Sequence, residues 1–271
     1  MIPVIFIHSG NSFYLEHTIL QACKYNQVIL LGNDDIKNKI SHDNLSFYNF
    51  NDYTKYVPEF SSIYEHLSFS GFEYELFCFL RWFILKEFME IHKFDTIFYV
   101  DSDVMLYVDV NKEYPKYNQY DFTLLHRSAG ISSFITKKGI NNFCEYTTNI
   151  YSNKDSVDYA KLTSKWKLHQ KFNLSGGVCD MTLLDGFHYD GKLGGPGRVG
   201  EMMTIINGST YDHNINVPDQ DFDYDGNIKK VEMVNGIPYI YSHSLNKKIK
   251  FNALHFQGSA KKYIKNYFTN G

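Results

Sequence analysis

Two aspartates near the middle of the chain have the spacing and the setting of a metal site. Asp101 and Asp103 flank Ser102 directly after the run Thr96–Val100, which predicts a strand buried on both faces. In an open α/β sheet, ligands bind at the carboxyl ends of the strands. Two carboxylates there can hold Mg²⁺ or Mn²⁺, which in turn can hold a diphosphate. The alternative is a solvated pair of acids, although acids this close need a cation or a proton to relieve their repulsion.

Three further Asp-x-Asp pairs overlap between Asp219 and Asp225. The sequence from Asp221 to Glu232 matches the calcium loop of an EF-hand. That loop requires a helix on each side, whereas Asn235-Gly236 downstream predicts a β-hairpin with a type I′ turn. We therefore interpret the segment as an acidic turn, with structural calcium as the alternative.

A second polar motif lies near the C-terminus, where His255, Gly258 and Lys261 follow each other at intervals of three residues. A neutral imidazole is a good third ligand for Mn²⁺. The glycine allows close approach of the backbone, and the lysine can neutralise a phosphate. A lone histidine is usually structural, but this combination favours metal ligation by His255.

The two motifs together resemble those of a known enzyme class. The segment from Phe98 to Val104 resembles the DxD segment of nucleotide-sugar glycosyltransferases with the GT-A fold, and the C-terminal motif resembles the His-x-x-Gly-x-x-Lys element of glycosyltransferase family 8. The resemblance implies a metal held by three side chains and a donor bound by residues around it. The implied metal ligands are Asp101, Asp103 and His255, and the implied donor-binding residues are His8, Ser9, Asn11, Arg81, Ser102, Gly258 and Lys261.

The segment from Phe172 to Met181 lies where GT-A enzymes build the acceptor side of the site. By that resemblance, Asp180 is an acceptor-binding carboxylate, or a general base in an inverting reaction. The alternative for Asp180 is a structural role, as a cap in a turn at the start of a strand.

The elements that must position these residues predict an α/β fold. Strands at residues 4–7, 28–31 and 96–100 alternate with helices at 15–23 and 72–92, which implies a mainly parallel sheet covered on both faces. Residues 122–125 and 177–184 are further apolar segments, residues 228–234 and 237–241 predict the hairpin, and residues 251–256 predict a strand before a helix at 261–268. We expect a single GT-A (Rossmann-like) domain over residues 1–271, with a mainly parallel central sheet flanked by helices and a C-terminal hairpin.

A glycine-rich stretch covers residues 191–200. It follows no clear strand and lacks Gly-Lys-Ser/Thr, so it is not a phosphate-binding P-loop. It is either a lid over the donor or a surface loop.

Composition excludes several classes of function. The formal net charge of −3 and the absence of a basic stripe argue against nucleic-acid binding. The four cysteines are scattered without zinc-like spacing, which favours a reducing compartment. The N-terminal apolar run is too short for a signal peptide, and charges interrupt the densest apolar stretch, so we expect a cytoplasmic protein without a transmembrane segment.

These observations predict a metal-dependent glycosyltransferase of the hexosyltransferase type, with Mn²⁺ or Mg²⁺ as cofactor. Its donor would be a nucleoside-diphosphate sugar, UDP-linked in preference to GDP-linked, and its acceptor a hydroxyl of a glycan or glycoconjugate. One alternative is a phosphohydrolase of the haloacid dehalogenase type, although Met105 stands where that motif requires Thr or Val. The other is a non-catalytic, metal-dependent carbohydrate-binding protein.

Overall fold

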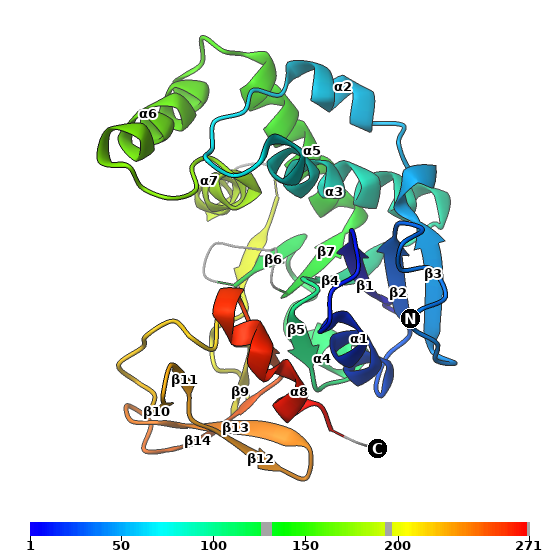
Figure 1. The fold of residues 1–271 in the computed structure, drawn as a ribbon, viewed down its shortest axis with the longest axis vertical. Helices are drawn as coiled ribbons and strands as arrows, with labels where there is room; N and C mark the ends of the chain where they lie inside the picture. The colour runs from blue at the N-terminus through cyan, green and yellow to red at the C-terminus, as the bar shows by residue number, and fades with distance from the viewer. Residues whose placement is uncertain (126–131, 193–196, 270–271) are drawn as a thin grey trace.

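The computed structural model describes residues 1–125, 132–192 and 197–269, and a seven-stranded sheet runs through the middle of the molecule (Figure 1). The strand order is β3-β2-β1-β4-β7-β6-β8. Among these strands only β7 runs against its neighbours. The strands are β1 (Val4–His8), β2 (Val28–Gly32), β3 (Leu45–Asn49), β4 (Thr96–Val100), β6 (Phe122–Leu124), β7 (Ser132–Thr136) and β8 (Val199–Glu201). The predicted α/β class with a mainly parallel sheet is therefore confirmed.

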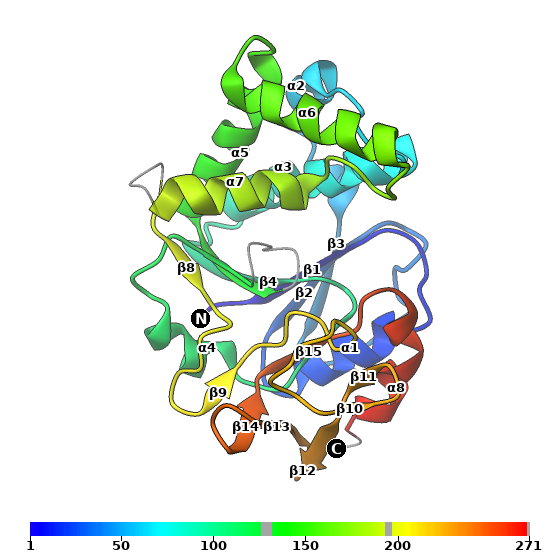
Figure 2. The same cartoon turned by 90° about the vertical axis from the view of Figure 1, so that its left-hand side faces the viewer.

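Helices cover both faces of this sheet, as Figure 2 shows. Alternate residues of each strand point to opposite faces, so Ile5 and Ile97 pack into one hydrophobic cluster while Phe6 and Phe98 pack into another. The first cluster includes residues of α2 (Val57–Ile63), α3 (Phe72–Ile91), α5 (Lys137–Ser152), α6 (Val157–Phe172) and α7 (Asp180–Lys192). The second includes α1 (Leu15–Cys23) and Val110 of the short α4 (Val110–Glu113). Two 3₁₀ turns, η1 (Phe50–Asp52) and η2 (Tyr114–Lys116), complete this part.

The local predictions for the first half agree closely with the structure. α1 and β4 have the predicted bounds, and α3 ends one residue earlier than predicted. The helix α3 is long and apolar. Its buried residues pack against the sheet and the neighbouring helices: Trp82 contacts β4 and α5, Phe83 stacks on Phe60 of α2, and Phe88 contacts β3. It therefore holds its one arginine, Arg81, beside the end of β4.

A smaller four-stranded sheet follows, in the order β12-β13-β14-β9, with β9 (Ser209–Thr210), β12 (Val231–Val234), β13 (Ile237–Ser242) and β14 (Lys247–Phe251). The pairs β12/β13 and β13/β14 are antiparallel, whereas β9 runs parallel to β14. The predicted hairpin is confirmed: Asn235 and Gly236 have φ of 51° and 75°, as a type I′ turn requires. The strand predicted from residue 228 is divided, because β11 (Ile228–Lys229) pairs separately with β10 (Tyr224–Asp225). The strands β10 and β11 and the start of β12 lie within the calcium-loop pattern, and no helix flanks it among the described residues, so the segment is not an EF-hand.

The strand predicted over residues 251–256 is interrupted at Asn252. The buried side-chain amide of Asn252 donates to Glu113 Oε2 over 2.9 Å. Its backbone N donates to the Thr210 carbonyl and its own carbonyl accepts from Tyr107 N, so the chain changes partner here from β9 to the β5 side. The chain then forms β15 (Ala253–His255), which pairs antiparallel with β5 (Val104–Leu106) directly after the two aspartates. A 3₁₀ helix, η3 (Gly258–Tyr263), and α8 (Ile264–Tyr267) replace the single helix predicted at residues 261–268.

Two further sequence expectations concern the chain as a whole. No helix among the described residues is long and apolar enough to span a membrane. The central part of the predicted lid or surface loop, residues 193–196, lies outside the described residues.

Replacing Gly139 by alanine is expected to destabilise the fold although it adds a helix-favouring residue. Gly139 lies in the first turn of α5, and an added Cβ would lie 2.1 Å from the carbonyl oxygen of Asp121. We expect Gly139→Ala to lower the free energy of unfolding by about 2 kcal/mol, measured by urea denaturation. Gly71→Ala meets no atom within 4 Å and is expected to cost less than about 1 kcal/mol. Equal stabilities of the two variants would contradict the packing argument.

Candidate functional site

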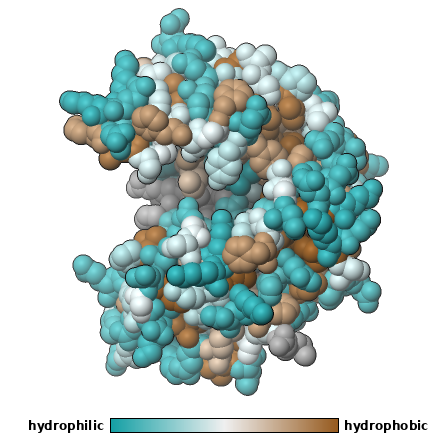
Figure 3. All heavy atoms as spheres, in the orientation of Figure 1, coloured by the Kyte–Doolittle hydropathy of each residue, from teal (hydrophilic) through white to brown (hydrophobic). Residues whose placement is uncertain are grey.

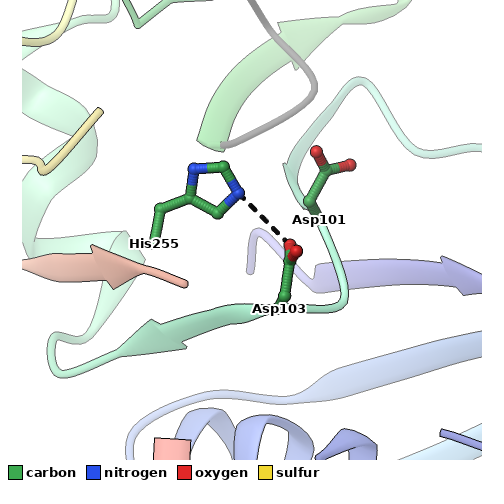
Figure 4. Close-up of side chains that lie close together, drawn as sticks. All are labelled: Asp101, Asp103 and His255. Carbon is green, nitrogen blue, oxygen red and sulfur yellow. Dashed lines mark ion pairs between the residues drawn. The ribbon is translucent and has the colours of Figure 1, made fainter. Parts of the chain in front are cut away.

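The β5–β15 pairing brings the two sequence motifs together. The turn after β4 is closed by a hydrogen bond from Val104 N to the Asp101 carbonyl, and Phe256 N donates to the Asp103 carbonyl over 3.0 Å. One ligand atom from each of Asp101, Asp103 and His255 lies within 4.8 Å of the others. Figure 4 shows the imidazole directed at the Asp103 carboxylate, where Nε2 lies 3.3 Å from Oδ1.

The imidazole of His255 is held in the tautomer that a metal ligand needs. Its Nδ1 lies 2.7 Å from the carbonyl oxygen of His213 and therefore carries a proton, which leaves Nε2 facing Asp103. Burial alone would lower the pKa of His255, but the hydrogen bond and the charge of Asp103 outweigh burial and raise it. Burial likewise opposes ionisation of Asp103, yet His255 and Lys261 keep the pKa of that carboxyl below its ordinary value.

Arg81 connects Asp101 to Asp180. Its Nη1 donates to Asp101 Oδ1 over 2.9 Å, and its Nη2 and Nε donate to Asp180 Oδ2 over 2.6 and 3.2 Å. Trp82 Nε1 donates to the same Oδ2 over 2.9 Å, while Asp180 Oδ1 accepts from Met181 N. Burial raises the pKa of Asp101 to about 7, although the positive charge of Arg81 opposes this rise.

Asp180 is the first residue of α7 and is 2% exposed. The structural alternative predicted from the sequence, a turn at the start of a strand, is therefore wrong about the element. A carboxylate at the start of a helix is favourably placed for the helix dipole. Both oxygens already accept hydrogen bonds from the protein, so the side chain is built into the wall of the site.

Lys261 and Gly258 both belong to η3. Lys261 Nζ lies 3.1 Å from Asp103 Oδ2 and 5.2 Å from the ring centroid of Tyr14. Burial lowers the pKa of Lys261, but Asp103 outweighs burial and raises it. Gly258 has a φ of 59° and no atom within 4 Å of an added Cβ, so it gives η3 its starting conformation beside open space.

The residues predicted near the nucleoside divide into two groups. His8 lies at the end of β1, where Nδ1 and Nε2 lie 3.0 Å from the hydroxyls of Ser102 and Ser12. Ser102 is held further by its carbonyl, which accepts from Thr18 Oγ1. Ser9 and Asn11 are exposed, and Asn11 lines a different cavity of about 350 Å³ with Ile36 and Lys39.

A cavity of about 460 Å³ contains the three candidate ligands together with Arg81, Lys261 and Asp180. The space-filling view shows a notch at its left edge, between the upper and lower parts of the molecule (Figure 3). Sequence reasoning missed Tyr74 and Cys78, which line the cavity from α3. They stand seven and three residues before Arg81, a helical repeat that places all three side chains on one face of α3. The sequence therefore contained a signal for Tyr74 and Cys78, namely their helical spacing from Arg81.

The charges of the cavity fit a divalent cation. The carboxylates among its described lining residues belong to Glu75, Asp101, Asp103 and Asp180, whereas Arg81 and Lys261 are the only arginine and lysine in that set. Two carboxylates and a neutral imidazole form a donor set suited to Mn²⁺ or Mg²⁺.

No family model matches the chain, and no curated protein sequence matches it. Its fold is similar to that of mouse xyloside xylosyltransferase 1, with 8% identity over 78% of this chain and 88% of that chain and a TM-score of 0.47. An active-site mutant of LgtC matches with 11% identity over 100% and 97% of the two chains and a TM-score of 0.47. The bifunctional glycosyltransferase WbbM matches with 11% identity over 99% and 50% and a TM-score of 0.48. At these identities and scores, the activity has to be inferred from the site.

Neutralising Asp180 should destabilise the protein, because Arg81 would lose its buried counter-charge. The side chains of Arg81 and Asp180 are 14% and 3% exposed. We expect Asp180→Asn to lower the free energy of unfolding by about 3 kcal/mol in urea denaturation. Exposed Asp155 offers a matched control, and Asp155→Asn should change stability by less than about 0.5 kcal/mol. A similarly small effect of Asp180→Asn would show that the pair does not hold Arg81.

Proposed function

We propose that this chain is a metal-dependent glycosyltransferase. It transfers a hexose from a nucleoside-diphosphate sugar, UDP-linked in preference to GDP-linked, to a hydroxyl of a glycan or glycoconjugate. The observation that carries the proposal is the convergence of Asp101, Asp103, His255 and Lys261 at one end of a 460 Å³ cavity. Three candidate metal ligands with a lysine beside them form an arrangement suited to a metal-bound diphosphate.

The residues of the cavity have complementary roles in this reaction. Asp101, Asp103 and His255 would hold Mn²⁺ or Mg²⁺, which stabilises negative charge on the diphosphate as it leaves. Lys261 is half-buried and reaches Asp103 through a flexible side chain, so it can turn to a phosphate oxygen and add a second positive charge. Ser102 and His8 lie next to the ligands and would contact the donor.

We assign Asp180 a positioning role rather than that of the general base, which the sequence suggested as one alternative. A general base has to reach the attacking hydroxyl, whereas both oxygens of Asp180 are already engaged by the protein. In Asp180, Oδ2 accepts from Arg81 and Trp82, and Oδ1 accepts from Met181 N. We assign Asp180 to holding Arg81, which in turn fixes Asp101.

Turnover of nucleotide sugars tests the proposal directly. The purified chain is incubated with UDP- and GDP-hexoses and MnCl₂, and release of nucleoside diphosphate is measured. We expect release from at least one donor, loss of release in EDTA and recovery when Mn²⁺ is restored. Undiminished release in EDTA would contradict metal dependence. Cleavage of simple phosphomonoesters would favour the phosphohydrolase, and binding without turnover would favour the carbohydrate-binding protein.

Removing one ligand should abolish turnover without unfolding the chain. We expect Asp103→Ala to reduce Mn²⁺-dependent release by about 100-fold or more, because the departing diphosphate loses its charge stabilisation. Asp223→Ala changes another Asp-x-Asp pair, which is exposed and is not among the described residues that line the cavity, and should retain full turnover. Circular dichroism of both variants controls for folding. Full activity of Asp103→Ala would exclude the site.

A further inference from the structure

A buried ion pair lies behind His255, outside the cavity. Lys229 of β11 and Asp212 are 5% and 1% exposed, and Lys229 Nζ lies 2.6 Å from Asp212 Oδ1. Neither is among the described residues that line the cavity. Two charges are kept out of water only where they pair and their other polar atoms are also bonded. Each of these partners is therefore strongly committed to the other.

Asp212 connects this pair to the backbone of His255. Its Oδ2 accepts from His255 N over 3.2 Å, and its own N donates to the Ala253 carbonyl over 3.1 Å. Ile215 N donates to the His255 carbonyl over 2.9 Å. Residues 212–215 thus lie alongside β15, and between these contacts the His213 carbonyl accepts from His255 Nδ1.

Lys229 holds the same segment at two further points. Its Nζ donates to the Asn214 carbonyl over 2.8 Å, and its backbone N donates to the Ile215 carbonyl over 2.8 Å. The His213 carbonyl, which accepts from the His255 ring, therefore lies between two residues, Asp212 and Asn214, and the ammonium group of Lys229 contacts both of them. Without this ammonium, the buried carboxylate of Asp212 would have no counter-charge and the segment would have to move to admit water.

We infer that Lys229 and Asp212 are positioning residues for His255, which they orient for metal binding through residues 212–215. The inference rests on the metal site of the proposed function. It also explains why the EF-hand pattern in the sequence is misleading, since its ninth position, Lys229, points into the interior as a counter-ion. Groups that orient a metal-bound histidine typically change metal affinity by about 10- to 100-fold when they are removed.

The test measures the binding of MnCl₂ alone, and the electron paramagnetic resonance signal of free Mn²⁺ gives the concentration that stays unbound. We expect Lys229→Met to raise the Kd for Mn²⁺ by about 10-fold or more. Lys230 is the adjacent, exposed lysine, and Lys230→Met should leave the Kd within about 2-fold of that of the unmodified chain. Near-ultraviolet circular dichroism without metal establishes that the variants keep their tertiary structure.

A second variant covers the case in which Lys229→Met does not fold. Asp212→Asn combined with Lys229→Met removes both buried charges, while the amide oxygen can still accept from His255 N. We expect this variant to fold and to bind Mn²⁺ more weakly than the unmodified chain, since the lysine contact to Asn214 is missing. If a folded variant binds Mn²⁺ with unchanged affinity, the positioning role of Lys229 and Asp212 is wrong, but the proposed metal site is not affected. Absence of Mn²⁺ binding by the unmodified chain would instead contradict the proposed metal site.

Discussion

The candidate site depends on the short antiparallel pairing between β5 and β15. Three residue pairs join Val104–Leu106 to Ala253–His255, and they are the reason that the C-terminal histidine faces the aspartates after β4. β5 can hold this position because it is buried on both sides. Val104 and Leu106 pack with α1 and the central sheet, whereas Met105 and Tyr107 pack with the smaller C-terminal sheet. One short strand therefore joins the cluster around α1 to a third cluster, which lies in the C-terminal part of the chain, and the candidate site follows at its end.

Electrostatics explain the arrangement around this pairing. The carboxylates of the cavity lie where water solvates them poorly, so each needs a partner of its own. Asp180 is paired with Arg81, Asp103 with Lys261 and His255, and Asp101 shares Arg81 while its pKa stays raised to about 7. For Asp101, burial outweighs the charge of Arg81, which it shares with Asp180. An added cation would therefore favour its ionised form.

The sequence predicted those features that depend on local pattern. The helical spacing of α3 and the apolar run of β4 gave the bounds of both elements almost completely, and the setting of Asp101 distinguished it from the other acidic pairs. The contacts that complete the site are between residues far apart in the chain. The bond of Arg81 to Asp180 and that of Lys229 to Asp212 leave no periodic signal, because each side chain is a single charge that a surface position would also tolerate. The break at Asn252 was missed for a similar reason, since its partner, Glu113, lies in another element.

The order of the chain has a consequence for folding. The central strand β1 begins at residue 4, whereas the strand that completes the set of candidate metal ligands ends at residue 255. Contacts of such long sequence separation carry a large loop-closure entropy and form late compared with helices and neighbouring strands. During synthesis the parallel strands β1 to β4 can assemble well before β15 has left the ribosome. The candidate cation site would thus be completed last, once the whole chain has reached its final topology.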